Sequence, residues 1–346
     1  MENVIVAPEV RALDVLAAQL ASWLASRIPQ ARDLSIENLS YPFGAGQSHE
    51  TILFDASWSE GGERRRQGCV LRIKPTWHTV FPDDLFEAQY RVMQAVHDHG
   101  QVRVARPLWF EEDPALLGSP FFIMERRRGR VPVSIPSYAE VGWVAEATPA
   151  QRAKLWESGV RQLAAIQSTP LSSVQFLQGP QGARDGLEQE WAKYVRFAAW
   201  VSQDRPWPAL QAGLDRLRSL WPKNQPPGLV WGDARLGNMM FDDDFEVVAV
   251  MDWEQPSLGG ALHDLAWWLY LSEVRHGAAS GRPLEGMGTR EETIALWREV
   301  TGISTDDIEW YEDFVALKLS CLGVRTASLK GWPLPDEAWM AKRLKV

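Results

Sequence analysis

Cysteine is scarce in this sequence: only Cys69 and Cys321 occur among 346 residues. Two cysteines are too few for a disulfide framework or a cysteine-rich zinc site. We therefore interpret both as buried, reduced thiols and expect a cytoplasmic protein. The amino-terminal stretch lacks a basic segment followed by an apolar one, so no secretory signal is expected.

Long apolar runs and an excess of basic residues are absent too. The nearest approach to a membrane helix, ALHDLAWWLYL, falls short of roughly 18 uninterrupted apolar residues and carries Asp264. The chain has 36 basic and 45 acidic residues, a net charge of −9. This balance argues against a broad nucleic-acid-binding surface, so we expect neither nucleic acid nor membrane as a partner. A net charge of −9 is still compatible with a local basic pocket that binds phosphate.

Tryptophan is abundant, with 18 residues, and 45% of the chain is hydrophobic. Such a chain can bury a large core, and most of the tryptophan rings are expected there or in the walls of a ligand site. At about 100–200 residues per domain, the length predicts two domains or one unit with two lobes.

Alternating apolar patterns dominate the first third and predict short strands. Helical patterns are expected over 10–28 and 83–99. Gly61 and Gly62 indicate a hairpin tip, to which we also assign the arginines at 64–66, as a solvated turn. The expected strands cover 34–42, 50–56, 68–74, 103–110 and 120–125.

Later in the chain the patterns become helical. Thr289 and Glu292, for example, predict a capping box for a helix that Gly302 ends. The predicted class is α+β and bilobal, with a small antiparallel β lobe carrying one helix over 1–126 and a larger, mostly helical lobe over 127–346. The junction of two such lobes is a preferred place for a ligand.

Three polar residues carry the strongest chemical signal. Asp233 precedes Asn238 by five positions, and Asp252 follows the apolar run 247–251. This layout is typical of phosphoryl transfer, in which a carboxylate accepts the proton of the attacking hydroxyl. An amide oxygen and a second carboxylate then suffice to hold Mg²⁺. Taken alone, the spacing also fits an acidic surface turn, but the flanking apolar runs place all three residues at strand ends.

The same segment resembles the catalytic region of the aminoglycoside phosphotransferase and choline kinase-like family, which shares the protein-kinase fold. That family has His-Gly-Asp, then Asn, then Asp, then Asp-Leu-Ala. The resemblance implies that Asp233 is the catalytic base and that Asn238 and Asp252 bind Mg²⁺. It also implies that Asp264 supports the catalytic loop through backbone hydrogen bonds. The matching segments here are Trp231-Gly232-Asp233, Asn238, Asp252 and Asp264-Leu265-Ala266.

The sequence does not assign a role to two residues of this loop, Trp231 and Arg235. Trp231 stands where the family has His, and an indole cannot reproduce both nitrogens of an imidazole, so we expect altered packing of the loop more than altered chemistry. Arg235 follows Asp233 by two positions and either faces the transferred phosphoryl group as part of the catalytic apparatus or is an exposed arginine.

The resemblance extends upstream to the nucleotide phosphates. Gly44, Gly46 and Ser48 lie between two strand-like runs, where small residues let backbone N–H groups approach phosphate, although such a pattern is more often a tight hairpin. Strand alternation puts Arg72 and Lys74 on one face. The resemblance implies that Arg72, with Lys74 as the alternate, contacts the phosphates.

The helix after this strand offers Glu87 or Gln89 as the partner of the phosphate-binding cation. The segment 118–130 resembles the strand and linker that contact adenine, with Met124 lining the purine pocket. Backbone groups near Glu125 and Arg127 would bind the base, so ATP is expected as the cofactor with Mg²⁺, and GTP stays open.

The acceptor site is expected in the helical lobe. No concentrated acidic cluster is seen there, which argues against a polycationic acceptor such as an aminoglycoside. Aromatic richness favours a partly apolar alcohol or an acyl-linked hydroxyl compound. The candidate wall residues, which can equally be core, are Trp191, Tyr194, Trp267 and Trp268.

We therefore predict an ATP- and Mg²⁺-dependent small-molecule phosphotransferase, and the oligomeric state stays open. The alternative is a nucleotide-binding pseudokinase or regulatory module, which Trp231 and Gln89 favour. A metal hydrolase using His263 would lack a dense ligand set. The short interval from Asp252 to His263 leaves no room for a peptide-binding activation segment, which argues against a protein kinase.

Overall fold

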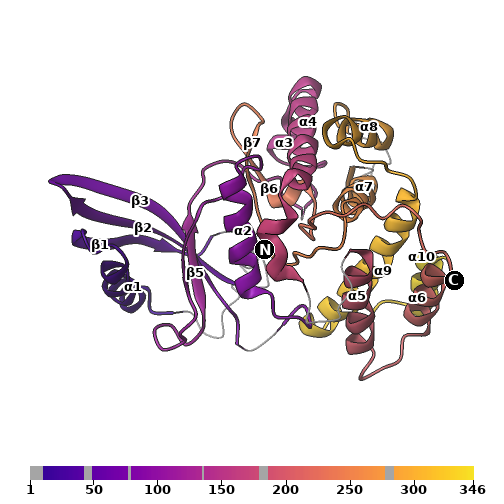
Figure 1. Cartoon of the computed structure of the whole chain (residues 1–346), viewed down its shortest axis with the longest axis horizontal. Coiled ribbons are helices and arrows are strands. Elements are labelled where there is room, and N and C mark those ends of the chain that lie inside the picture. Colours follow the sequence, from indigo (N-terminus) through magenta and orange to yellow (C-terminus); the bar gives the residue numbers. More distant parts are fainter. Residues whose placement is uncertain (1–10, 43–48, 77–78, 135, 179–185, 277–283) are drawn as a thin grey trace. The chain divides into compact units, whose positions relative to one another are not determined.

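The computed structural model describes residues 11–42, 49–76, 79–134, 136–178, 186–276 and 284–346. Figure 1 labels most of the helices and strands that these residues form. They gather into two compact units. One contains the described residues up to Thr79 together with Ala105–Arg127, and the other contains Val80–Val104 and Arg128–Val346.

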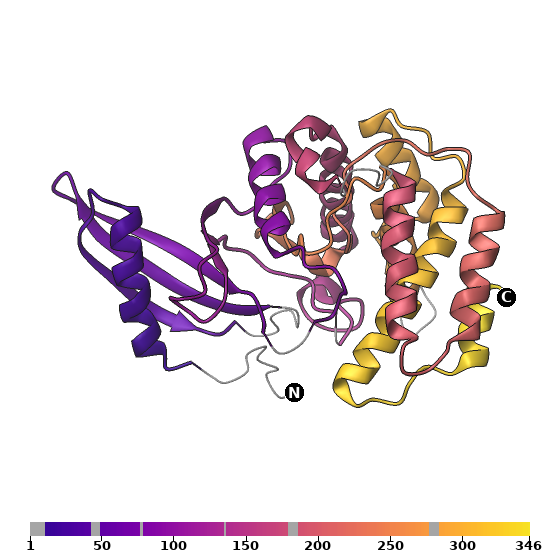
Figure 2. The same ribbon diagram turned by 60° about the horizontal axis from the view of Figure 1, so that its bottom comes forward.

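The first unit is an antiparallel sheet with a helix packed on one face (Figure 2). Its strands follow the order β1-β2-β3-β5-β4. All the predicted strands exist, with ends that differ by a few residues from the predicted ones. The elements are α1 (Leu13–Arg27), β1 (Arg32–Ser40), β2 (Glu50–Glu60), β3 (Glu63–Ile73), β4 (Pro107–Glu111) and β5 (Phe121–Glu125).

Strand alternation produces the core of this unit. Cys69, Leu71 and Ile73 project from the same face of β3 and are buried. They pack with the leucine stripe of α1, which comprises Leu16, Leu20 and Leu24. The thiol of Cys69 is free and buried, as is that of Cys321 in the second unit, in agreement with the prediction.

The β2–β3 hairpin turns at Gly61 and Gly62, whose φ angles of 58° and 85° are left-handed. Glycine adopts this backbone at little cost, and it matches the twist of paired strands. The assignment of the arginines at 64–66 to the tip is wrong, because pairing begins directly after the turn and places them within β3 opposite Ser57–Ser59. Arg66 Nη2 donates to the Asp55 carboxylate over 2.7 Å.

The second unit is mostly helical and is built around the long helix α9 (Ile308–Lys330), which packs against α5, α6, α7 and α10. As predicted, the capping box of Thr289 and Glu292 begins α8, and the left-handed Gly302 ends it. The elements are α2 (Phe86–His99), α3 (Trp143–Glu146), α4 (Pro149–Ala165), α5 (Leu187–Val201), α6 (Pro208–Ser219), β6 (Met239–Phe241), β7 (Val247–Val250), α7 (Leu262–His276), α8 (Arg290–Thr301) and α10 (Glu337–Leu344), with short 3₁₀ turns at Ile166–Ser168, Leu171–Leu177 and Leu236–Asn238.

Helix α2 corrects the predicted division of the chain. It was expected in the first lobe, 1–126, but it groups with the second unit. The reason lies in contacts that sequence patterns do not reveal. The Arg91 guanidinium lies 4.0 Å from the centre of the Phe176 ring, and His99 is hydrogen-bonded to Ser168 over 3.1 Å. After α2, Arg103 O accepts a 2.7 Å hydrogen bond from Val250 N at the end of β7.

Candidate active site

A short hairpin brings Asn238 and Asp252 together. Asn238 directly precedes β6, Asp252 follows β7 by two residues, and Met239 pairs with Val250. The open end of the hairpin closes with a 2.8 Å hydrogen bond from Met251 N to Asn238 O. Asp252 has a left-handed φ of 63°, a backbone state that is rare outside glycine and is concentrated at functional sites.

The carboxylate of Asp233 is held by three donors. Its Oδ2 accepts hydrogen bonds from Asn238 Nδ2 over 2.7 Å and from Arg235 Nε over 2.9 Å. Its Oδ1 accepts one from the indole nitrogen of Trp267 over 2.9 Å. Asn238 Nδ2 also donates to the backbone oxygen of Asp233. The amide nitrogen is thus committed to Asp233, and the amide oxygen is the atom through which Asn238 can coordinate a cation.

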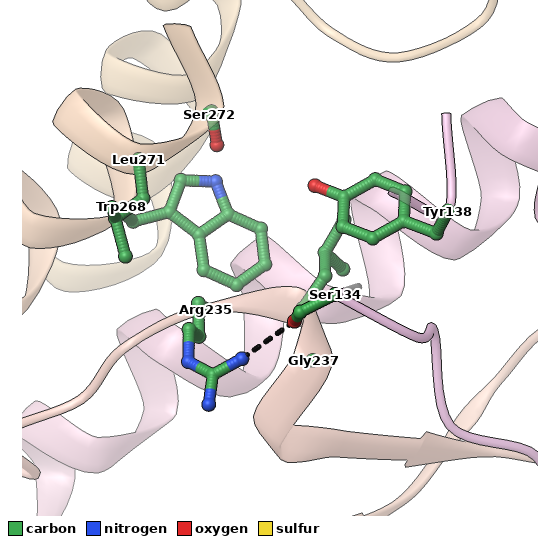
Figure 3. A pocket seen from close by; sticks show the side chains of 8 residues that line it. Ser134, Tyr138, Arg235, Gly237, Trp268, Leu271 and Ser272 are labelled. Carbon is green, nitrogen blue, oxygen red and sulfur yellow. Dashed lines mark hydrogen bonds between the residues drawn. The ribbon is translucent and has the colours of Figure 1, made fainter. Parts of the chain in front are cut away.

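Arg235 lies among these carboxylates rather than in solvent. Burial alone lowers the pKa of its guanidinium, but the carboxylates of Asp233 and Asp252 outweigh burial and raise that pKa. Asp252 is therefore within electrostatic range of Arg235. Nη1 of Arg235 donates to Ser134 Oγ over 2.7 Å, a contact that Figure 3 shows. The structure thus gathers Asp233, Arg235, Asn238 and Asp252.

Asp264, near the start of α7, holds the loop that precedes Asp233. Its two carboxylate oxygens accept the backbone N–H groups of Trp231 over 2.6 Å and Gly232 over 2.9 Å. The side chain is buried, and this burial raises its pKa to about 6. Gly232 has a φ of 108°, and a Cβ there would lie 2.6 Å from Gln255 O, so only glycine fits this turn.

Trp231 fills the interior beneath the same loop. Its side chain is fully buried, and Nε1 donates to Met251 O over 2.8 Å. The indole therefore ties the loop that carries Asp233 to the strand end that precedes Asp252. It makes this link with its single donor, whereas an imidazole has two polar nitrogens.

A buried ion pair lies under the segment between Asp252 and Asp264. Lys318 Nζ on α9 is 2.7 Å from Glu190 Oε1 on α5, and both side chains are at most 3% exposed. The second oxygen of Glu190 accepts a 2.6 Å hydrogen bond from Ser257 Oγ. Lys318 Nζ also lies 3.3 Å from His263 Nδ1. One cluster therefore connects α5, α7 and α9 to the loop after Asp252.

Burial affects the two charges of the pair differently. Burial outweighs Glu190 and lowers the pKa of the Lys318 ammonium group. Burial alone raises the pKa of Glu190, but Lys318 and Lys193 outweigh it and hold that pKa far below its usual value. Burial and the neighbouring Lys318 lower the pKa of His263 well below its ordinary range. His263 is therefore a neutral imidazole at physiological pH, with Nδ1 facing the ammonium group as an acceptor.

The four aromatic candidates for an acceptor wall divide into two pairs. Trp191 packs against Phe314 at 5.4 Å between ring centres, and Tyr194 against the same ring at 5.7 Å, so both belong to the core. Trp267 binds Asp233, and Trp268 lines a small cavity beside Arg235. Sequence patterns did not indicate the contact between Trp267 and Asp233, because adjacent tryptophans on a helix equally predict core packing.

Five of the residues predicted to bind nucleotide lie in or just after strands β3 and β5 of the first unit. Arg72 sits in β3, with Nη2 2.9 Å from His49 Nδ1. Lys74 follows the strand, and its backbone N donates to Pro120 O. Met124 and Glu125 end β5, and Arg127 Nη1 lies 3.3 Å from Glu125 Oε1. Their roles toward a nucleotide stay predictions, and Gly44, Gly46 and Ser48 lie outside the described residues.

The two candidates for the partner of Arg72 differ in their surroundings. The Glu87 side chain is 61% exposed and makes a 3.5 Å salt bridge with Arg91 one turn further along α2. The Gln89 side chain is buried, and neither polar atom of its amide has a hydrogen-bond partner in the described part of the chain. A pairing of either residue with Arg72 stays a prediction.

The described residues contain no group of three His, Cys, Asp or Glu side chains that could hold a metal ion. The metal-hydrolase alternative therefore finds no ligand set in that part of the chain. Within the same residues, no helix has the length and apolar character needed to cross a bilayer.

Comparison with known proteins identifies the family. The model of the phosphotransferase enzyme family matches residues 42–302, a range that includes the whole cluster around Asp233. The chain belongs to this family. As a family member it is a phosphotransferase of the protein-kinase-like α+β fold, in agreement with the fold class predicted from the sequence.

The similar curated proteins are longer than this chain. Acyl-CoA dehydrogenase family member 11 from Pongo abelii is 28% identical over 281 residues, which cover 78% of this chain and 33% of that protein. The Homo sapiens protein of the same name is 27% identical over 281 residues, with the same shares of the two chains. This chain thus spans about a third of the length of the curated relatives that it matches.

Solved structures share the fold at low identity. A Ralstonia eutropha protein, described as a candidate aminoglycoside phosphotransferase, is 22% identical with a TM-score of 0.67, covering 95% of this chain and 94% of that one. An aminoglycoside phosphotransferase in ternary complex with ADP and hygromycin B is 16% identical with a TM-score of 0.58, covering 94% and 97%. These likenesses support the fold and not a particular acceptor.

Proposed function

We propose that this protein is a nucleoside-triphosphate- and Mg²⁺-dependent phosphotransferase that phosphorylates a hydroxyl group of a small molecule. The observation that carries the proposal is the gathering of Asp233, Arg235, Asn238 and Asp252 at the ends of one hairpin and its preceding loop. ATP is the proposed donor and GTP stays open, since solved relatives of the same fold were captured with ADP and with GDP.

Asp233 is the proposed base. Its Oδ2 accepts two hydrogen bonds and its Oδ1 accepts one among the described residues, so Oδ1 has a lone pair left for the acceptor hydroxyl. The acceptor oxygen bonds to the γ-phosphorus while the bond from that phosphorus to the β-phosphate oxygen breaks. The hydroxyl proton passes to Asp233, and the nucleoside diphosphate leaves. Three fixed donors keep the carboxylate oriented throughout.

The residues present fit a magnesium site. The Asn238 amide oxygen and the Asp252 carboxylate are hard oxygen ligands at the open end of one hairpin, and Mg²⁺ bound by proteins commonly keeps water and phosphate as its other ligands. Mg²⁺ bound there would neutralise charge on the phosphates. Arg235 adds a fixed positive charge, and its Nη2 has no partner among the described residues, so this nitrogen is the proposed contact to the transferred phosphoryl group.

Nucleotide contacts are proposed for the first unit. Arg72, with Lys74 as the alternate, would bind the phosphates, and Met124 would line the purine site. Backbone groups near Glu125 and Arg127 would bind the base edge. The backbone N–H of Glu125 is already bonded to Arg106 O, so a contact of Glu125 with the base would use its carbonyl as an acceptor.

The acceptor is proposed to be a partly apolar alcohol or an acyl-linked hydroxyl compound. The described residues that line the one-water-sized cavity beside Arg235 include aromatic rings and Leu271 but no carboxylate, so this part of the site offers an ammonium group no partner. The names of the curated relatives, acyl-CoA dehydrogenase family members, support an acceptor that carries an acyl group.

The test is transfer of phosphate from ATP and Mg²⁺ to a panel of hydroxylated acids, simple alcohols, sugars and aminoglycosides, followed by mass spectrometry. We expect a product among the acids or alcohols. Asp233→Asn should lower its turnover by about a hundred- to ten-thousand-fold, because the base is lost. The matched control is Asp243→Asn in the fully exposed turn between β6 and β7, which should leave turnover unchanged.

Two outcomes would contradict the proposal. Equal turnover in wild type and Asp233→Asn would remove Asp233 from the chemistry. A wild type that binds Mg·ATP and phosphorylates no member of the panel would favour the regulatory module that Trp231 and Gln89 allow.

A further inference from the structure

A small cavity lies directly beside the proposed base. Its wall includes Arg235, which is hydrogen-bonded to Asp233 over 2.9 Å, and Trp268, Leu271 and Ser272 of α7. Tyr138, from the segment before α3, faces them across the cavity (Figure 3). A group that occupied this cavity would therefore belong to the same molecule as a hydroxyl placed at Asp233.

The indole N–H of Trp268 is the unusual feature of this wall. The ring is 1% exposed, and Nε1 has no hydrogen-bond partner within the described part of the chain. In Figure 3 its nitrogen edge faces the side of the cavity where the hydroxyl oxygens of Ser272 and Tyr138 lie. Buried donors almost always have an acceptor, and indole N–H groups in cores usually find one. The described residues therefore leave this donor without an acceptor, and an oxygen in the cavity would supply one.

The charge and polarity of the wall restrict that molecule. Arg235 and Trp268 are donors only, and the described lining contains no carboxylate to receive an ammonium group. Leu271 and the two aromatic rings add apolar surface. The cavity measures about 10 Å³, which is room for one water-sized group. It thus suits a single carbonyl or carboxylate oxygen, with the rest of the ligand outside it, and it disfavours an ammonium group.

We infer that Trp268 is a specificity-determining residue that donates its indole N–H to a second oxygen of the acceptor molecule. This inference rests on the proposed function, because it places that oxygen and the phosphorylated hydroxyl on one molecule. An acceptor with both groups gains the hydrogen bond, whereas a simple alkanol leaves the buried N–H unpaired. Discrimination against the alkanol follows from the unpaired donor rather than from shape.

The decisive variant is Trp268→Phe, which keeps an aromatic ring and removes the N–H. Hydroxyacyl thioesters of N-acetylcysteamine and alkanols of matched length serve as probes. We expect kcat/KM for the thioesters to fall about ten- to a hundred-fold, and kcat/KM for the alkanols to change less than about threefold. The control is Trp310→Phe, a buried tryptophan on α9 whose N–H donates to Leu217 O. It should leave the ratio of the two probes unchanged.

A second measurement tests binding without turnover. The indole N–H resonance of Trp268 is assigned as the peak missing from the Trp268→Phe spectrum. Saturation with a hydroxyacyl thioester should shift this proton downfield, and saturation with an alkanol should not. If the thioester shifts the resonance but no probe is phosphorylated, the hydrogen bond from Trp268 to a bound ligand is supported and the proposed function fails.

Either of two results overturns the inference. An active wild type whose probe ratio is unchanged in Trp268→Phe shows that the N–H contributes nothing to selection. A Trp268 resonance that does not respond to the thioester shows that a water or a protein group satisfies the indole.

Discussion

Asp264 is a buried carboxylate that accepts hydrogen bonds from two backbone N–H groups, those of Trp231 and Gly232. Burial disfavours its charged form, and the two donors oppose this effect only in part, so its pKa rises to about 6. At neutral pH the ionised form of Asp264 holds the loop with both oxygens. Keeping this charge buried lowers the free energy of unfolding, and the loss becomes smaller as the pH falls and Asp264 is protonated.

This gives a pH prediction for a single residue. A carboxylate whose folded pKa lies above its ordinary 3.8 contributes most stability below 3.8, and this contribution is lost as pH rises through about 6. Asp264→Asn does not titrate in this window. We expect the free energy of unfolding of wild type, minus that of the variant, to fall by about 2 kcal/mol between pH 4 and pH 7. Denaturant titrations at several pH values measure it, and a difference independent of pH would contradict it.

At the scale of elements, the ion pair of Glu190 and Lys318 joins α5 to α9 in the interior of the second unit. Aromatic packing surrounds the pair, with Lys318 Nζ 4.7 Å from the centre of the Tyr194 ring and 4.6 Å from that of Phe314. Removing one partner from such a pair leaves a buried charge uncompensated, whereas removing both does not. The pair therefore makes the two helices interdependent.

A double-mutant cycle tests this interdependence. We expect Lys318→Met to lower the free energy of unfolding by about 3–5 kcal/mol. Glu190→Gln combined with Lys318→Met should lower it by clearly less than the sum of the single changes, because neither member of the ion pair is left buried without the other. Lys330→Met, at the end of the same helix, is the surface control and should stay within about 0.5 kcal/mol of wild type. Additive losses would show that the two side chains act independently.

At the scale of the whole molecule, the proposed function requires the folded protein to bind nucleotide with its metal. A ligand that binds only the folded state stabilises it, by about 2.7 kcal/mol at a hundred times its Kd. The part of this stabilisation that requires Mg²⁺ should depend on the hairpin residues Asn238 and Asp252, while the remainder should not.

Thermal unfolding with ADP therefore gives a prediction for the metal. We expect Mg²⁺ and ADP together to raise the Tm of wild type by several degrees, and EDTA to remove most of that rise. Asp252→Asn should abolish the Mg²⁺-dependent part and keep a smaller shift from ADP alone. Asp243→Asn is again the matched control and should behave as wild type. An Asp252→Asn variant with the full Mg²⁺-dependent shift would place the metal elsewhere.

The local parts of the fold and site were predictable from sequence. The capping box at Thr289, the glycine turn at Gly61 and Gly62, and the hairpin that brings Asn238 near Asp252 all depend on residues a few positions apart. Periodicity and turn chemistry specify such features because their interactions are themselves local.

The sequence by itself determined the α+β class and the family, and it supplied the residues proposed for phosphoryl transfer, because these follow from short patterns and their spacing. Only the tertiary structure decided that α2 groups with the helical unit, that Ser134 binds Arg235 and that Lys318 pairs with Glu190. The two contacts join residues 101 and 128 positions apart. No local pattern specifies which of many charged or polar side chains will meet, because that depends on how the whole core packs.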